Sequence, residues 1–447
     1  MRNSLRRVAA SLMTGGAIDR WSVEIERALR RPNAVADVEL VDAVVADATE
    51  SIPFYQRLRP AVSSLEDLPV IDKMSMRSNL SLFMTPGADI SKLASRSTSG
   101  STGVPFTVYM EPARATRNRA GAVASLRYAG GDPFAPNVRT RAWAAPSVKD
   151  KVLNFLKEDY AYNGDHFATE PVLDIAKWMS RRRGVVVQGY SSYLEKILRV
   201  FEDHGVTFAP GTVSAVMSGA EAPTEYMFDA TERVFGVQAH ARYSNMELGV
   251  MSASSRENRT EYKVDVSSFH VEILSEESDD PVAPGELGRV VVTDLHNRVM
   301  PLLRYDTGDM ARFRVDENGN AIRNVITDIR GRRLDVLVAG TSAVPHRAHP
   351  LAVWGPAARV SELRQFQLRQ HDVGHFTWVL NADKSDATEN KLRSILDERI
   401  GDVVTCDFVY VDDVPVLASG KRQFFVNEIE DPLTFIAERT GGGATGR

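Results

Sequence analysis

The stretch SRSTSGSTGVPF, residues 95–106, combines hydroxyl side chains and glycines in a pattern that suits phosphate binding. Glycine costs backbone entropy in regular elements, and Ser and Thr compete for backbone hydrogen bonds, so the composition predicts a loop. The backbone N–H groups and hydroxyls of such a loop can surround polyphosphate oxygens. The stretch matches neither a Walker A loop nor a dinucleotide-binding fingerprint. Taken alone, it is better explained as a surface linker.

Four later segments carry charged and aromatic side chains that catalysis or ligand binding could use. Tyr243 and Glu247 share the turn-like segment YSNMELG. The segment MPLLRYDTGDMARF places Asp306 and Asp309 around a Thr-Gly pair. GRRLDVLVAG follows, and ASGKRQFF brings Lys421 near the end of the sequence. Together these segments favour a binding element over a linker for the hydroxyl-rich loop.

The composition is that of an ordinary soluble globular protein, with 43% hydrophobic and 25% charged residues. At 447 residues the chain is longer than one hydrophobic core usually serves, so two or more domains are expected. A net charge of -5 predicts neither a nucleic-acid partner nor a membrane surface. The single cysteine, Cys406, excludes an internal disulfide framework and suits a reducing cytoplasm.

Hydrophobic periodicity predicts mostly helices over residues 1–90 and alternating strands and helices after about residue 180. GVVVQGY reads as a buried strand, and the helix after it is expected to begin with a capping box formed by Ser192 and Glu195. EYKVDVSSFHVEIL and GELGRVVVTDL predict two strands separated by an acidic turn. Residues 335–447 predict a small α+β unit. This alternation favours an α/β architecture.

In their order and spacing these segments resemble the adenylate-forming enzymes, the superfamily of acyl-CoA synthetases and adenylation domains. The phenylacetate-CoA ligase and CapK-like branch is the most similar. IPFYQRLRP with SLEDLPVIDKMSMRSNL resembles its N-terminal signature, TSGSTGVP its phosphate loop, and SGAEAP with YSNMELG its adenine and magnesium segments. GELGRVVVTDLHNRVMPLLRYDTGD is similar to its ribose-binding segment, GRRLDVLV to its hinge, and RQFQLRQ to a strand of its C-terminal domain. The resemblance covers nearly the whole chain.

The resemblance implies the adenylate-forming α/β fold. A large N-terminal α/β domain is expected over residues 1–333, with a mostly helical lead-in over residues 1–90. A small, mobile α+β lid domain with a flexible tail is expected over residues 334–447.

The resemblance also implies a nucleotide site. Lys421 would bridge the acid carboxylate and the α-phosphate, Glu247 would help to hold Mg²⁺, and Arg332 would lie near the ribose and phosphates. Asp309 would accept hydrogen bonds from both ribose hydroxyls. The other ATP- or AMP-binding residues would be Thr98, Ser99, Gly100, Ser101, Thr102, Gly103, Ser218, Gly219, Ala220, Glu221, Tyr243, Ser244, Asn245 and Met246.

The chain departs from the family pattern at several positions. Val104 stands where the family usually has lysine, which removes one point charge from the phosphate loop. Ser244 reduces backbone freedom, and Met246 replaces a hydroxyl that often touches the phosphate region. Leu334 stands where many members have an acidic residue at the hinge, which bears on the motion of the lid.

Each candidate residue also has a plainer interpretation. Glu247 would then be a solvated carboxylate at a helix start, Asp309 a turn residue, Arg332 an exposed arginine, and Lys421 a surface lysine. Retention of all four together favours a functional site. Trp143 and Tyr190 are candidates for the acyl pocket, although an aromatic residue near a strand end is more often part of the core.

The expected activity is that of an ATP-dependent, Mg²⁺-requiring carboxylate ligase that forms an acyl-adenylate and passes the acyl group to coenzyme A. Two alternatives stay open: transfer to an amine or other nitrogen nucleophile, and a degenerate homologue that binds nucleotide or a partner protein without catalysis. The expected partners are a small carboxylic acid and the acyl acceptor, with no nucleic acid and no membrane. The resemblance is also compatible with a homodimer.

Overall fold

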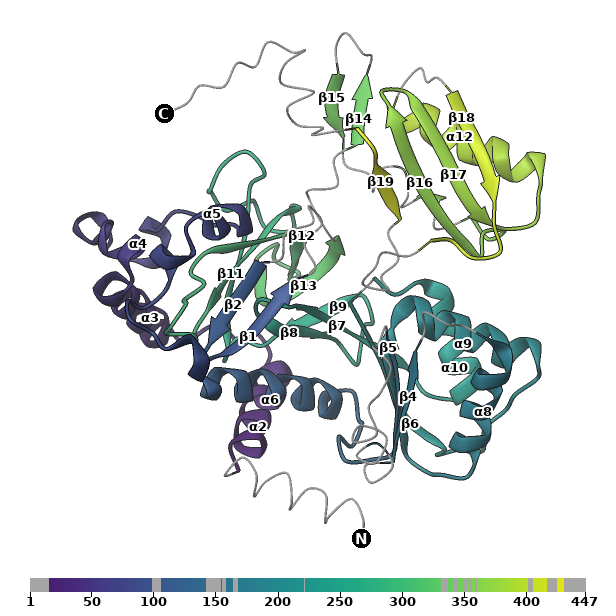
Figure 1. Ribbon diagram of the computed structural model, residues 1–447, viewed down its shortest axis with the longest axis horizontal. Coiled ribbons are helices and arrows are strands. Elements are labelled where there is room, and N and C mark those ends of the chain that lie inside the picture. The colour runs from purple at the N-terminus through teal and green to yellow at the C-terminus, as the bar shows by residue number, and fades with distance from the viewer. Residues whose placement is uncertain are drawn as a thin grey trace. The chain divides into compact units, whose positions relative to one another are not determined.

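The computed structural model describes residues 16–98, 106–141, 154, 158–163, 168–220, 222–330, 337–340, 345–348, 353, 356–357, 360–400, 405–415 and 424–429. The chain folds as two compact units, Met1–Gly331 and Arg332–Arg447 (Figure 1). Each unit has its own hydrophobic core or cores. The predicted domain boundary between residues 333 and 334 lies outside the described residues.

An 11-stranded sheet runs through the described part of the first unit in the order β10-β11-β12-β13-β9-β8-β7-β6-β5-β3-β4. β7 (Ala239–Asn245) divides it, since it pairs parallel with β6 (Val213–Gly219) and antiparallel with β8 (Gly249–Ser254). The other strands of the parallel half are β3 (Asn137–Arg141), β4 (Asp159–Asn163) and β5 (Val185–Tyr190). The antiparallel half adds β9 (Glu261–Val264), β10 (Phe269–Leu274), β11 (Gly288–Asp294), β12 (Tyr305–Val315) and β13 (Ala321–Arg330).

Three helices cover one face of the parallel half (Figure 1): α8 (Thr169–Ser180), α9 (Ser191–Asp203) and α10 (Glu225–Phe235). Their apolar residues recur at helical spacing and pack on Val185, Val187, Val213 and Val216 of the strands. α10 has well-formed ends, because the Thr224 hydroxyl accepts a hydrogen bond from the N–H of Met227 and Gly236 takes a left-handed φ of 68°.

The opposite face of the sheet is covered by α6 (Pro112–Tyr128). Leu126 and Ala129 pack on Val186, Ala215 and Met217, which alternate with the valines of the other face. α2 (Ala17–Arg30) packs on α6 through Ile25 and Leu29. The parallel half therefore lies between two helical layers, as expected for an α/β fold.

The N-terminal region packs on the antiparallel half. α3 (Val38–Ser51) buries Val41, Val44, Val45 and Ala48. α4 (Pro53–Gln56) buries Tyr55, whose hydroxyl donates a 3.4 Å hydrogen bond to the Pro301 carbonyl. Two short 3-10 helices, η1 (Arg59–Ala61) and η2 (Leu65–Asp67), lead from α4 to α5 (Lys73–Ser78), and η3 (Leu80–Phe83) and η4 (Ile90–Lys92) follow α5. The expected helical character of residues 1–90 is confirmed for the described part.

Three local predictions were wrong. Residues 95–98 belong to β1 (Ala94–Thr98) and not to a loop, because they pair with β2 (Phe106–Met110). EYKVDVSSFHVEIL forms two strands, β9 and β10, because Ser267 donates backbone and hydroxyl hydrogen bonds to the Asp265 carboxylate in a turn between them. α9 begins without a capping box, since Glu195 instead accepts a 2.7 Å hydrogen bond from the Thr224 hydroxyl.

The described part of the second unit has an α+β arrangement. Its four-stranded sheet has the order β18-β17-β16-β19, with β16 (Gln365–Asp372), β17 (His375–Asn381), β18 (Thr405–Tyr410) and β19 (Phe425–Asn427). α12 (Asp386–Ile400) packs on this sheet through Leu392 and Leu396, and β14 (Leu337–Gly340) pairs with β15 (Pro345–Ala348). No helix in the described ranges is long and apolar enough to cross a membrane.

Candidate active site

The predicted phosphate loop connects the two strands of a hairpin. Thr98 is the last residue of β1 and pairs with Phe106, the first residue of β2. The backbone therefore enters and leaves residues 99–105 at neighbouring points. Ser99, Gly100, Ser101, Thr102 and Gly103 lie outside the described residues, and so does Val104.

Glu247 lies in the tight turn between β7 and β8. The Asn245 side chain accepts a 2.7 Å hydrogen bond from the N–H of Leu248, which closes the turn around Glu247. Gly249 follows with a φ of +90°, and a Cβ there would lie 2.6 Å from Oδ1 of Asn118, so glycine is required by both backbone and space. Glu247 is buried with 9% of its surface exposed, whereas Met246 beside it is 45% exposed. The solvated helix-start interpretation of Glu247 is therefore wrong.

Two side chains from distant segments face the Glu247 carboxylate. Tyr305 on β12 donates a 3.4 Å hydrogen bond to its Oε1, and Lys73 Nζ lies 4.0 Å from the same atom. Burial and the nearby Glu247 charge hold the pKa of Tyr305 well above its ordinary value, so the phenol remains a hydrogen-bond donor. Lys73 also lies 5.9 Å from the ring centroid of Phe106, next to the end of the predicted phosphate loop.

Tyr243 and Asp309 are in direct contact. The Tyr243 hydroxyl donates a 2.8 Å hydrogen bond to Oδ2 of Asp309 and lies 3.2 Å from the Thr307 hydroxyl. Thr307 in turn donates to the Val290 carbonyl at 2.9 Å, which ties the group to β11. Burial and the Asp309 charge raise the pKa of Tyr243, so its proton stays in place at neutral pH. The turn interpretation of Asp309 is also wrong, because the residue lies within β12.

The predicted adenine segment begins at the carboxyl end of β6. Ser218 is buried, and its hydroxyl donates to the His240 carbonyl at 3.4 Å. Gly219 ends the strand, and Ala220 has a φ of +68°, which is uncommon for a residue with a side chain. Glu221 lies outside the described residues. This segment is next to β7, with Ser218 paired to Ala241, two residues before Tyr243.

Other predicted residues lie outside the described part of the chain. They are Arg332, Leu334 and Lys421, together with Trp143. Their predicted roles stay predictions. Tyr190 is described, and its ring stacks on Tyr193 with centroids 5.6 Å apart.

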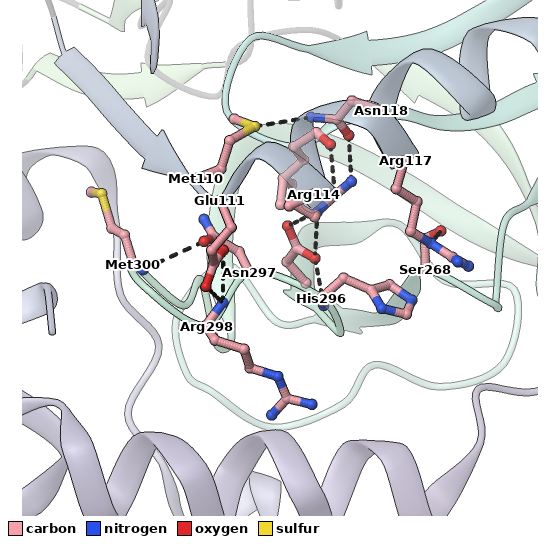
Figure 2. A network of polar contacts seen from close by, with 12 residues as sticks. Met110, Glu111, Arg114, Arg117, Asn118, Ser268, His296, Asn297, Arg298 and Met300 are labelled. Atoms are coloured by element: carbon pink, nitrogen blue, oxygen red, sulfur yellow. Dashed lines mark hydrogen bonds and ion pairs between the residues drawn. The ribbon is translucent and has the colours of Figure 1, made fainter. Parts of the chain in front are cut away.

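A buried network is built around Arg114 (Figure 2), and it also contacts the Glu247 turn. Arg114 on α6 donates to the Asp294 carboxylate through Nε at 2.7 Å and to the Leu248 carbonyl through Nη2 at 3.0 Å. It also contacts the Asn118 side chain. The Arg114 and Asp294 side chains are each only 2% exposed. Because Leu248 directly follows Glu247, Arg114 links the turn to α6 and to the end of β11.

A second group of buried charges supports the strand that carries Asp309. Arg289 on β11 donates to Asp306 at 3.1 Å, and the Asp306 Oδ1 accepts from the N–H of Gly308 at 2.8 Å. Arg304 pairs with Glu272 at 3.0 Å and has a φ of +47°. The charges of Asp306 and Arg304 are thus used in contacts that stabilise the fold. Asp309 instead contacts Tyr243.

No sequence motif assigned a role to Lys73 or Arg114. Lys73 lies in VIDKMSM, inside the segment that resembles the N-terminal signature. This position is the feature of the sequence that could have marked Lys73 as a candidate residue. Arg114 had no local signal, because its partners Leu248 and Asp294 are 134 and 180 residues away.

The site fits a magnesium ion held together with a polyphosphate. In the described ranges, no group of three or more His, Cys, Asp and Glu side chains could hold a metal by itself. Mg²⁺ usually keeps several waters and binds one or two carboxylates together with substrate phosphates. The single buried Glu247 carboxylate matches that donor set, and Lys73 contacts both Glu247 and Phe106, which follows the predicted phosphate loop.

No family model matches the chain. It is 23% identical to protein CapK of Staphylococcus aureus over 385 residues, which cover 83% of this chain and 81% of CapK. It is 25% identical to the phenylacetate-coenzyme A ligase of Thermus thermophilus over 322 residues, 65% of this chain and 68% of that enzyme. The solved 2-hydroxyisobutyryl-CoA ligase in its postadenylation state, in complex with R3-HIB-AMP, aligns with a TM-score of 0.64 at 16% identity over 90% of both chains. The same ligase in complex with 2-HIB-AMP and CoA aligns with a TM-score of 0.54.

The fold is that of the adenylate-forming enzymes. The similarity to CapK and to two phenylacetate-coenzyme A ligases supports the resemblance of the chain to that branch of the superfamily.

Proposed function

We propose that the protein couples a carboxylic acid to ATP, releases pyrophosphate, and transfers the acyl group from the adenylate to coenzyme A. One observation carries the proposal: the Tyr243–Asp309 contact joins the segment that resembles the magnesium motif to the segment that resembles the ribose motif. A scaffold without nucleotide chemistry has no need to bring these two segments together. CoA is favoured as acceptor because the curated ligase relatives are named for it.

The proposed reaction has two steps, adenylation and acyl transfer. A carboxylate oxygen of the acid attacks the α-phosphorus of ATP, and the bond to the β-phosphate oxygen breaks to release pyrophosphate. The CoA sulfur then attacks the acyl carbon, AMP leaves with the bridging oxygen, and the thiol proton passes to solvent. The first step joins two anions and the second attacks a reactive mixed anhydride, so positioning, charge neutralisation and exclusion of water are the main requirements.

The described residues meet part of these requirements. Asp309 would accept the ribose hydroxyls, and Tyr243 holds its carboxylate in one orientation. Glu247 would hold Mg²⁺, which neutralises phosphate charge when bound, and Tyr305 orients the Glu247 carboxylate. Lys73 adds a positive charge at the edge of the predicted phosphate loop.

The remaining roles rest on the sequence resemblance. Residues Thr98 to Gly103 would surround the β- and γ-phosphates, Ser218 to Glu221 and Ser244 to Met246 would line the nucleotide, and Arg332 would contact ribose and phosphate. Lys421 would bridge the acid carboxylate and the α-phosphate only during adenylation.

ATP–pyrophosphate exchange without an acceptor tests the first step. Aryl, fatty, amino and hydroxy acids are supplied in turn, and exchange that depends on a particular acid supports adenylation. Lys421→Ala should slow this exchange by orders of magnitude yet leave transfer from a preformed adenylate largely intact. Equal losses in both steps would contradict the role of Lys421. No exchange with any acid, from folded protein, would contradict the proposed function.

The acceptor is tested in a second assay. Wild-type protein with ATP and the active acid receives CoA, a panel of amines or no acceptor, and AMP release is followed. Turnover that requires CoA supports thioester formation. Turnover with an amine and none with CoA would replace CoA as the proposed acceptor and leave the adenylation step standing.

A further inference from the structure

Arg242 is a partly buried cation for which the described part of the chain offers no carboxylate partner. It lies on β7, directly before Tyr243. Its Nη2 donates a 2.7 Å hydrogen bond to the amide oxygen of Gln188 on β5, and its buried Nε has no hydrogen-bond partner. No acidic side chain of the described residues forms an ion pair with it.

Among the described residues of the same unit, the four buried arginines each have an acidic partner. Arg114 pairs with Asp294, Arg117 with Glu24, Arg289 with Asp306 and Arg304 with Glu272. This contrast is informative because burying a charge costs free energy unless a partner offsets it. Arg242 differs from these four arginines, because its side-chain partner is an amide and not a carboxylate.

Burial without a compensating charge lowers the pKa of Arg242 to about 10. The guanidinium remains positively charged at neutral pH, and an anion placed against it would be bound with little competition from the protein. The Gln188 amide oxygen already accepts from Arg242, so the amide nitrogen of Gln188 is left as a further donor. Arg242 and Gln188 together present donors and no accessible carboxylate.

The pair lies at the edge of the sheet where ligands bind in open α/β folds. Gln188 and Arg242 reach each other across β6, near its end at Gly219. A Cβ at Gly219 would lie 4.0 Å from the Cβ of Arg242, in ordinary contact, so the two residues are direct neighbours on β6 and β7. The carboxyl ends of parallel strands form the usual ligand-binding edge of such sheets.

The same edge carries the proposed nucleotide site. Tyr243, the next residue along β7, contacts Asp309, and Ala220 follows Gly219. Neighbouring residues on a strand point to opposite faces of the sheet, so Arg242 does not share the face on which Tyr243 meets Asp309. An acid that extends from the nucleotide across this edge to the opposite face of the sheet would bring its acyl part toward Arg242.

We propose that Arg242 and Gln188 form a subsite for an anionic group on the acyl part of the substrate, so that the preferred acids carry a second carboxylate. This inference rests on the proposed adenylation function and adds the substrate class. The second carboxylate would take hydrogen bonds from the guanidinium and from the Gln188 amide nitrogen, and it would supply the missing counter-charge.

Matched pairs of acids test the proposal in ATP–pyrophosphate exchange. Butyrate is compared with succinate, hexanoate with adipate, and phenylacetate with 1,4-phenylenediacetate, so that each pair differs mainly by the second carboxylate. Wild-type protein should show a kcat/KM for at least one diacid that is about 10-fold or more above that of its monoacid, as expected for a charge-assisted hydrogen bond.

Arg242→Met should lower exchange with the preferred diacid about 100-fold while exchange with the matched monoacid stays within about 3-fold. Arg181→Met, at an exposed arginine after α8, is the control and should leave both values unchanged. Equal use of monoacids and diacids by the wild type, or an equal loss of both in Arg242→Met, would overturn the proposal.

Thermal unfolding separates this inference from the proposed function. Succinate, adipate or phenylenediacetate should raise the Tm of the wild type and not of Arg242→Met. Without any acid, Arg242→Met should unfold at a higher temperature than the wild type, because an uncompensated cation has been removed. If diacids selectively raise the Tm but no acid supports exchange, the adenylation function is contradicted and the subsite is not. If only monoacids support exchange, the subsite is contradicted and adenylation is not. If no acid raises the Tm or supports exchange, both proposals are overturned.

Discussion

The phenolic hydroxyl of Tyr243 donates a 2.8 Å hydrogen bond to the carboxylate of Asp309, a residue 66 positions further along the chain. The contact spans the antiparallel half of the sheet, since Tyr243 lies on β7 and Asp309 on β12. It brings together two segments that sequence resemblance assigns to one nucleotide. A carboxylate held in this way keeps a fixed orientation without losing its charge.

Tyr243→Phe should raise the KM for ATP about 5-fold and change kcat little, because one hydrogen bond that orients Asp309 is lost while the ring still fills its place. The free energy of unfolding should fall by about 1 kcal/mol. Initial rates of ATP–pyrophosphate exchange over a range of ATP concentrations give the two constants. Asp309→Ala should raise the KM for ATP further than Tyr243→Phe does. An unchanged KM in Asp309→Ala would contradict the ribose contact.

Glu247→Gln should lower the rate of adenylation about 100-fold and raise the Mg²⁺ concentration needed for half-maximal exchange, because a neutral amide is a poorer ligand for a hard cation. Glu317→Gln, in an exposed turn, is the matched control and should behave as the wild type. A magnesium titration of exchange in the three proteins measures this. Coinciding magnesium curves for Glu247→Gln and the wild type would remove the metal role from Glu247.

Lys73→Met should weaken the use of ATP, because the cation 4.0 Å from Glu247 and beside Phe106 would no longer offset phosphate charge. We expect a rise of about 10-fold in the KM for ATP at low ionic strength, and a smaller rise at high salt, where charges are screened. Lys177→Met, at an exposed lysine on α8, is the control. A KM that is the same in Lys73→Met and the wild type at both salt concentrations would contradict this role.

Arg114→Met should destabilise the protein by about 3–5 kcal/mol, because it leaves the Asp294 carboxylate buried without its partner. The double variant Arg114→Met with Asp294→Asn should recover part of this loss, since the unpaired charge is then removed. Arg127→Met, on the same helix in a more exposed pair with Asp19, should cost about 1 kcal/mol or less. Urea unfolding compares the variants, and equal losses for Arg114→Met and Arg127→Met would refute the argument.

His296 should make the protein less stable in mild acid. Burial first, and then the nearby Arg117 and Arg114 charges, lower its pKa in the folded state, against smaller opposing effects of the Ser267 carbonyl and the Asp294 carboxylate. The unfolded chain therefore binds more protons between the lowered pKa and about 6.5, so stability falls as pH falls through this window and levels off below it.

The measurement is the free energy of unfolding between pH 5 and pH 8 for the wild type and His296→Gln. The variant should lose less stability than the wild type on acidification, while His204→Gln, at an exposed histidine, should follow the wild type. If His296→Gln and the wild type lose stability in parallel, His296 does not contribute to the pH dependence.

Much of the fold follows from local patterns in the sequence. The valines of GVVVQGY and the apolar spacing in the helix after it are enough to predict β5 and α9, because periodicity reports which face is buried. Glu247 and Asp309 were also identified from their segments. The resemblance assigned them to one nucleotide site, but no local pattern states that their segments meet.

Local patterns could not predict the contacts that a residue makes with partners elsewhere in the fold. Residues 95–98 look like a loop by composition, yet they form β1 because β2 supplies backbone partners. Glu195 has the spacing of a capping box, but its carboxylate instead accepts a hydrogen bond from the Thr224 hydroxyl. In both cases a tertiary partner outweighed a local preference of similar size.

The sequence by itself determined the α/β class, the order of the segments and the identity of most candidate residues, because these depend on periodicity and on residue types at short spacing. Only the tertiary structure decided which charges are compensated. Arg114 and Arg242 are equally cationic in the sequence, but folding gives Arg114 a buried carboxylate and leaves Arg242 with an amide. The cost of a buried charge depends on its three-dimensional neighbours, and no local pattern records them.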